Sequence, residues 1–262
     1  MTIIIKRKLL NRFLLSLIYL DLIIGTELLT VFNPVIGILL HITTLVLLLI
    51  HSTLSTDRKF SQLLLVLTLA PIIRILSLSL PLHHFSKITW FALISIPVYI
   101  AIFTCMHLQH LKPREIGLSP PRLRFLPIDL VMISVAFPVG LIEYQILKPE
   151  PIVNLLEGEA LISSSIIMIL STGFLEELAF RGIIQYHATN TMGIYGIFYV
   201  SFVFSILHIG NLSIFDILLA FFVGLAYSIV VMKTGSIYGV SLSHGIINIV
   251  LFILAPAGIL TL

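Results

Sequence analysis

The sequence predicts an all-α fold, a polytopic transmembrane helical bundle of about eight or nine spans. Of the 262 residues, 58% are hydrophobic and only 10% are charged, and the mean hydropathy is +1.14. Soluble domains carry about 25% charged residues. Apolar runs of roughly 20 residues, each long enough to cross a hydrocarbon core of about 30 Å, follow one another along the chain. We therefore expect an integral protein of the cell membrane, with the lipid bilayer as its first partner.

The apolar runs and the polar punctuation between them define the expected spans. They cover residues 9–31, 34–54, 60–80, 88–107, 128–147, 160–187, 194–210, 214–232 and 237–256. The first run follows the basic cluster Lys6, Arg7, Lys8 and Arg12, which should stay in the cytoplasm. Because this run is too long for a signal peptide and no clear small-residue cleavage pattern follows it, we expect a retained first span.

A cytoplasmic N-terminus orients the remaining loops. Alternating the spans places the basic loop residues inside, as the positive-inside rule requires. These residues are Arg58, Lys59, Lys112, Arg114, Arg122 and Arg124, whereas Glu150, Glu157 and Glu159 fall outside. Prolines make the connection from His107 to Pro127 an irregular segment. It divides an N-terminal four-span block (1–110) and a cytoplasmic loop (111–127) from a helical block (128–262) that carries the candidate chemistry.

Several classes of function are excluded by what the sequence lacks. The lone cysteine, Cys105, leaves no internal disulfide and no multi-cysteine metal site. No Gly-rich phosphate loop or nucleotide fingerprint is present. Lys and Arg fall in short clusters between apolar runs, which is typical of topology signals and not of a nucleic-acid surface, so we expect no nucleic-acid partner. The glycines at 173, 182, 224 and 239 are expected at close helix contacts.

Three ionisable residues stand inside an apolar run, in the stretch from Ser171 to Gly182. A charge at membrane depth costs from roughly 2.5 to more than 10 kcal/mol unless it is paired or faces a water-filled cavity. Glu177 and Arg181 are four residues apart and should form an ion pair on one helix face. Glu176 points in a different direction, so we expect it to face a reaction centre. Glu177 and Arg181 would then hold helix geometry.

Two later stretches supply partners for Glu176. Phe204 and His208 are four residues apart, as are His244 and Asn248, so each pair shares a helix face. Either histidine alone could be a satisfied core residue. Together with a carboxylate, two imidazoles can bind a metal or orient a water and a carbonyl, and an amide N–H can stabilise an oxyanion. This set suits hydrolysis of an amide bond.

Four other charged residues lie within the expected spans. Asp21, Glu27, Arg74 and Glu143 are each expected to pair within the bundle or to reach the membrane interface. We assign them structural roles.

The three motifs together resemble those of the CPBP (Abi) family. The resemblance runs over roughly residues 115–256 and includes the lead-in Glu115-Ile-Gly-Leu118. This family groups CAAX prenyl endopeptidases of the Ras-converting type with bacterial proteins linked to bacteriocin processing and immunity. The resemblance implies an intramembrane endopeptidase acting on a membrane-associated peptide or protein. Glu176 would activate the water with help from His208, while His244 and Asn248 would stabilise the oxyanion.

The resemblance leaves the need for a metal open. Family members are often called metalloproteases, yet the same residues support a metal-free, glutamate-dependent mechanism. Glu176, His208 and His244 would suit zinc with one open position. However, no His-Glu-x-x-His helix is present.

Two readings from other classes also stand. One is a non-catalytic immunity or membrane-interaction protein that keeps the motifs for structure. The other is a small proton-coupled transporter, against which the absence of a visible repeat counts. Under the protease reading, counting about 1.5 Å per residue along the spans predicts a cavity open to the cytoplasm, with His208 at its floor.

Overall fold

The structure is a computed structural model that describes residues 2–81, 84–153 and 158–260. Within these ranges every regular element is helical. The α-helices are α1 (Thr2–Phe32), α2 (Pro34–Leu54), α3 (Arg58–Leu67), α4 (Leu69–Ser79), α5 (Lys87–Leu108), α6 (Leu126–Leu147), α7 (Gly158–Met168), α8 (Leu175–Glu177), α9 (Gln185–Met192), α10 (Tyr195–Ile206), α11 (Ile214–Thr234) and α12 (Tyr238–Ile249). Short 3₁₀ turns cover Pro113–Ile116, Leu123–Phe125 and Ile209–Asn211.

The helices confirm the all-α membrane bundle and most of the predicted boundaries. Seven described helical segments are long and apolar enough to cross a membrane. The segments expected as the seventh and ninth spans are shorter, at Tyr195–Asn211 and Tyr238–Leu254, so a count of eight or nine includes these short helices. The third span is broken between α3 and α4 at Thr68. Pro71 accounts for the break, because it cannot donate to the carbonyl of Leu67.

Capping residues mark where α2 and α11 begin and where α11 ends. The side chain of Asn33 accepts hydrogen bonds from the backbone N–H groups of Val35 and Ile36 and caps α2, which starts at Pro34. The hydroxyl of Ser213 caps α11 in the same way. Gly235 follows α11 at φ +71°, a left-handed conformation that favours glycine.

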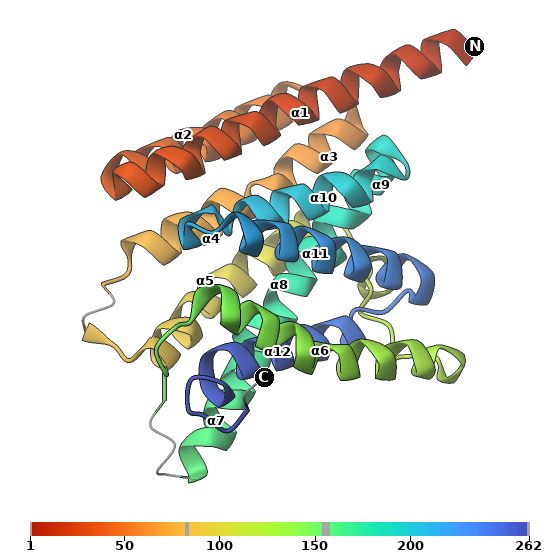
Figure 1. Cartoon of the computed structure of the whole chain (residues 1–262). Coiled ribbons are helices and arrows are strands. Elements are labelled where there is room, and N and C mark those ends of the chain that lie inside the picture. The colour runs from red at the N-terminus through yellow and green to blue at the C-terminus, as the bar shows by residue number, and fades with distance from the viewer. Residues whose placement is uncertain (1, 82–83, 154–157, 261–262) are drawn as a thin grey trace.

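The bundle has two distinct ends, and hydrogen bonds between distant segments identify each of them. At the first, the hydroxyl of Thr191 donates to the carbonyl of Lys59, and the Ile237 N–H donates to the carbonyl of Gly117. We call this the basic end, because it receives all of the 15 Lys and Arg residues except Arg74, Lys87, Lys148 and Arg181. At the opposite end the Ile152 N–H donates to the carbonyl of Phe252. In Figure 1 the basic end is on the right.

The segment from α7 to α9 crosses the bundle obliquely and positions the charged residues. Two π-helical stretches, Ile169–Phe174 and Leu178–Ile184, flank the short α8, so that the three form one continuous but irregular helix. Figure 1 shows it rising from α7 at the bottom to α9 at the upper right, across the direction of the other helices.

Close contacts with other helices are confirmed at Gly173, Gly224 and Gly239, whereas Gly182 faces the 3₁₀ turn that contains Ile116. A side chain at Gly173 would stand 2.5 Å from the carbonyl oxygen of Ser241 and 2.6 Å from the amide nitrogen of Gly245, both in α12. At Gly224 it would stand 2.6 Å from Nη2 of Arg181. The N-terminal and C-terminal blocks also pack against each other, since α3 contacts α9 and α1 contacts α10. The division at residues 111–127 stays a prediction, and Glu157 lies outside the described residues.

Candidate active site

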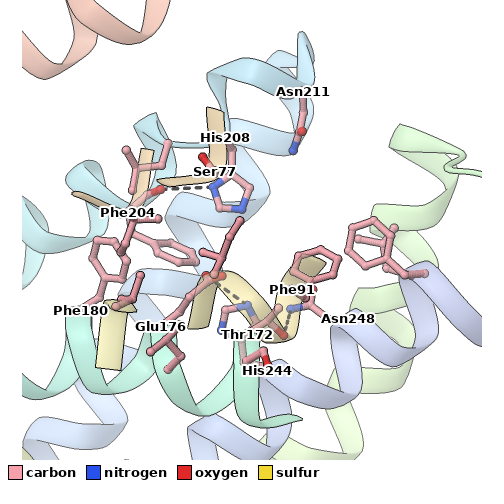
Figure 2. A pocket seen from close by; sticks show the side chains of 18 of the residues that line it. Ser77, Phe91, Thr172, Glu176, Phe180, Phe204, His208, Asn211, His244 and Asn248 are labelled. Carbon is pink, nitrogen blue, oxygen red and sulfur yellow. Dashed lines mark hydrogen bonds and ion pairs between the residues drawn. The ribbon is translucent and has the colours of Figure 1, made fainter. Parts of the chain in front are cut away.

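The three motifs meet at one cavity of about 470 Å³. Its wall includes Glu176 from α8, His208 after α10, and His244 and Asn248 from α12. Figure 2 shows these four side chains arranged around a common space. Helices α4, α5 and α6 complete the wall with Arg74, Ser77, Trp90, Phe91 and Glu143 among other residues. The volume falls within the roughly 300–1,000 Å³ of ordinary ligand pockets.

The cavity lies on the side of the site away from the basic end. Besides the motif residues, its wall is built where α4 and α6 end and α5 begins, at Ser77, Leu147 and Trp90. The expected cavity, open to the cytoplasm with His208 as its floor, does not fit a cytoplasmic basic end. Which side of the membrane each end faces stays a prediction. Counting residues along a helix gives the depth of one residue. It does not give the side on which neighbouring helices leave a space, which depends on their packing.

The two glutamates have different environments, as the sequence predicts. The side chain of Glu176 is 30% exposed and borders the cavity, whereas that of Glu177 is fully buried. Adjacent helical residues point about 100° apart, which accounts for the difference. π-helical turns are frequent at functional sites, and here they flank the short helix that carries both carboxylates.

Glu177 accepts from two cationic or potentially cationic partners through one oxygen. The Nη1 group of Arg181 donates to Oε1 at 3.0 Å, and Nδ1 of His244 lies 2.8 Å from the same atom. The ion pair with Arg181 was predicted, but the contact with His244 was not. Because a carboxylate oxygen only accepts, His244 carries a proton on Nδ1 when it makes this bond. Its Nε2 then faces Glu176, whose Oε2 lies 3.9 Å away.

Aromatic rings surround the buried guanidinium of Arg181. Its central carbon lies 4.1 Å from the ring centre of Phe204, 5.8 Å from that of Tyr227 and 6.0 Å from that of Phe180. Two of its nitrogens, Nε and Nη2, have no hydrogen-bond partner among the described residues. Cation–π contacts with these rings stabilise the charge where hydrogen bonds are missing. The motif residue Phe204 thus contributes a ring face to Arg181.

His208 is held in one orientation by its own helix. Its Nδ1 lies 3.2 Å from the carbonyl oxygen of Phe204, one turn earlier, and a carbonyl can only accept. Nδ1 is therefore the donor, and a neutral His208 keeps a free lone pair on Nε2. Since His208 lines the cavity, this lone pair can accept a proton from a water or a substrate there.

Asn248 is oriented by Thr172, a residue that the sequence analysis missed. The side-chain amide of Asn248 donates to Oγ1 of Thr172 at 2.9 Å, and the Thr172 hydroxyl donates to the carbonyl of Met168 at 2.5 Å. These two hydrogen bonds in series fix the direction of the Asn248 amide and leave its second N–H for another acceptor. Thr172 precedes Glu176 by one helical turn, so i,i+4 spacing was the signal that could have identified it.

Two charged residues expected to be structural also line the cavity. These are Glu143 of α6 and Arg74 of α4. Arg74 does pair within the bundle, since its Nε donates to Oε1 of Glu27 at 2.7 Å. Asp21 is exposed on α1, and its structural role stays a prediction. No sequence pattern separates Arg74 or Glu143 from other intramembrane charges.

The lead-in Glu115-Ile-Gly-Leu118 lies at the basic end, outside the membrane-spanning segments. Glu115 accepts from the backbone N–H of Lys112 at 2.7 Å and from the hydroxyl of Tyr186 at 3.1 Å. The hydrogen bond from the Lys112 backbone has the largest effect and lowers the pKa of Glu115. Desolvation opposes it, and the hydrogen bond from Tyr186 lowers the pKa further. The lead-in thus fastens the connecting loop to α9.

The expected zinc ligands do not form a metal site as they are placed. Among the described residues, no three His, Cys, Asp or Glu side chains gather closely enough to hold a metal ion. His244 uses Nδ1 for Glu177, and His208 turns Nδ1 to its own helix. Zinc at Glu176, His208 and His244 stays a prediction, and no step proposed below passes through a metal.

Comparison with known proteins points to one family. Residues 158–250 match the family model described as type II CAAX prenyl endopeptidase Rce1-like. Searches of curated proteins and of solved structures found no match. The matched segment contains Glu176, Glu177, Arg181, His208, His244 and Asn248, and it leaves out helices α1 to α6. Residues 158–250 of this integral membrane protein are therefore similar to the Rce1-like type II CAAX prenyl endopeptidases.

Proposed function

We propose that this protein is an intramembrane endopeptidase that hydrolyses a peptide bond of a membrane-associated substrate with a water activated by Glu176. The observation that carries the proposal is the convergence of Glu176, His208, His244 and Asn248 on one cavity inside a membrane bundle. The match to a CAAX endopeptidase family supports the same reaction class.

Glu176 is the general base in this mechanism. A water between Glu176 and Nε2 of His208 gives a proton to the carboxylate, and its oxygen forms a bond to the substrate carbonyl carbon. The carbonyl oxygen becomes an oxyanion. The free N–H of Asn248 stabilises this oxyanion, together with Nε2 of His244 when that imidazole is protonated. The C–N bond then breaks, and the proton on Glu176 passes to the leaving amine.

Glu177 and Arg181 position this machinery and do not contact substrate. Glu177 holds the proton on Nδ1 of His244, and Arg181 balances the charge of Glu177. The similarity to the family and the position of the cavity support a membrane-associated substrate. A prenylated C-terminal peptide or a leader peptide of a membrane-associated protein would each reach an intramembrane cavity.

A substitution that removes the base tests the proposal. We expect Glu176→Gln to lower cleavage by at least a hundredfold, because a general base contributes about 10²–10⁴-fold. The protein should still insert and unfold like wild type, since little volume changes. Comparative membrane proteomics would follow a processed terminus that disappears in the variant, and Glu150→Gln, at an exposed carboxylate, serves as the matched control.

Retained processing above about a hundredth of the wild-type rate would overturn the role of Glu176. Assays of peptide cleavage and of proton-coupled uptake with the purified wild-type and Glu176→Gln proteins distinguish the protease from the two alternative functions. An immunity or membrane-interaction protein would process no terminus and be indifferent to Glu176→Gln. A proton-coupled transporter would instead lose uptake in vesicles.

A further inference from the structure

Arg74 is a cation in the wall of the cavity, supplied by the part of the chain outside the family match. Its Nε donates to Oε1 of Glu27 in α1 at 2.7 Å, and Nε2 of His41 lies 3.3 Å from the same oxygen. The Glu27 side chain is fully buried, whereas 17% of the Arg74 side chain is exposed. One edge of the guanidinium is therefore held by the bundle, and the group still reaches the cavity.

The terminal nitrogens of Arg74 are the available donors. No hydrogen bond from Nη1 or Nη2 is present among residues 2–81, 84–153 and 158–260. Neither atom is among the buried, unpaired ones, in contrast to Nε and Nη2 of Arg181. Nη2 also stands 3.5 Å from the point where a side chain at Gly210 would begin. The open donors thus lie beside the turn that carries His208.

No other Lys or Arg lines the cavity in the described part of the chain. Glu143 and Glu176 give the rest of the wall an acidic character, so a negatively charged ligand group has one place to bind. The two Nη groups of a guanidinium form a planar fork that matches the two oxygens of a carboxylate. An endopeptidase that cleaves near a chain end, or next to an acidic side chain, offers such a group.

We propose that Arg74 binds a carboxylate of the substrate peptide and so fixes which bond reaches Glu176. The inference rests on the proposed protease function and makes Arg74 a specificity-determining residue. A cavity of about 470 Å³ holds only a short piece of peptide, so the carboxylate lies close to the scissile bond in sequence. It is either the free C-terminal carboxylate or an Asp or Glu side chain.

Photo-crosslinking measures this binding without requiring hydrolysis. Three pools of short hydrophobic peptides carry the same benzophenone residue. The first ends in a free carboxylate, the second in a carboxamide, and the third in a carboxamide but with one internal glutamate. The full chain with Glu176→Gln, in lipid vesicles, is labelled with each pool. We expect the free-carboxylate or the glutamate pool to label about 10- to 100-fold more than the plain carboxamide pool, as for a hydrogen-bonded charge.

Substitution of Arg74 should remove the preference. With Arg74→Met added, all pools should label at the low level of the carboxamide pool, and Arg74→Lys should keep only part of the difference because it lacks the fork. Arg12→Met is the matched control, since Arg12 pairs with Asp57 through two hydrogen bonds of 2.8 Å and does not line the cavity. It should keep the full preference. If Arg74→Met unfolds, the double variant Arg74→Met/Glu27→Leu removes both buried charges together.

Three outcomes would overturn the proposal. The Glu176→Gln protein with Arg74 intact could label equally with all pools or with none, or the preference could persist after Arg74→Met is added. The pool that labels best identifies the source of the carboxylate. If Arg74-dependent labelling is present but Glu176 proves dispensable for processing, the binding site stands and the proposed hydrolysis fails.

Discussion

Glu177 is the residue that joins the structural and the chemical parts of the site. One of its oxygens accepts from both Arg181 and His244, while its other oxygen has no partner among the described residues. A buried carboxylate in this position depends on both contacts. Arg181 depends in turn on Glu177 and on the rings of Phe204 and Tyr227. Loss of one member therefore leaves the others as uncompensated buried charges.

Arg181→Ala should destabilise the protein by about 3–5 kcal/mol and lower activity, because it leaves Glu177 buried without its cation. Thermal unfolding in detergent measures the first effect. Arg12→Ala, at the bidentate pair with Asp57 whose side chains are 13% and 18% exposed, should cost less than loss of the fully buried Arg181 and leave activity unchanged. A fully stable but inactive Arg181→Ala protein would favour a direct role of Arg181 in substrate binding.

Thr172→Val should lower the cleavage rate roughly tenfold, since the lost hydrogen bond to Asn248, at about 1–1.5 kcal/mol, no longer orients the amide in the transition state. The side-chain volume is conserved, so no cavity forms, and the melting temperature should fall only by the few degrees that the lost hydrogen bonds cost. Thr172→Ser keeps the hydroxyl and should restore most of the activity. A rise in KM with kcat unchanged would contradict oxyanion stabilisation by Asn248.

At the scale of helices, the site depends on a close crossing between the irregular segment α7–α9 and α12. Gly173 and Gly245 face each other where the two cross, and backbone atoms fill the space where a side chain at Gly173 would stand. This contact brings His244, the neighbour of Gly245, within reach of both glutamates. The π-helical stretches change the local turn on either side of α8.

Gly173→Ala should force α12 away from α8, because the added methyl would meet the carbonyl of Ser241 and the amide of Gly245. We expect a loss of about 1–3 kcal/mol in stability and a marked loss of cleavage. Gly25→Ala in α1 is the control, since nothing lies within 4 Å of its new methyl. That variant should be neutral or more stable by about 0.5–1 kcal/mol. Equal effects of the two substitutions would contradict a special role for this crossing.

At the scale of the whole molecule, the basic residues and the cavity lie toward different ends of the bundle. The positive-inside rule predicts that the basic end faces the cytoplasm. The cavity wall extends from Glu176 and His244 to Pro149 and Asn211, near the opposite end. This orientation predicts that a substrate reaches Glu176 from the outer half of the membrane.

Cysteine labelling in a Cys105→Ala background tests this orientation. Glu150→Cys, beside the cavity end, should react with an impermeant thiol reagent from outside intact cells. Lys233→Cys, exposed at the basic end, should react only after the membrane is opened. The reverse pattern would show that the basic end is outside and that the cavity faces the cytoplasm.

Features that depend on neighbours along one helix could be predicted from the sequence. Apolar length fixed the long spans to within a few residues, and i,i+4 spacing fixed the pair between Glu177 and Arg181. Because adjacent helical side chains point about 100° apart, the sequence also predicted different environments for Glu176 and Glu177. These relations follow from helix geometry, which is the same in any fold.

Features that depend on how separate helices pack could be seen only in the folded protein. Glu27 and Arg74 are 47 residues apart, Thr172 and Asn248 are 76 apart, and no period in the sequence links them. The position of the cavity likewise depends on where side chains from α4, α5, α6 and α12 leave space. Contacts between distant segments are set by the packing of whole helices, so a pattern within any one segment cannot specify them.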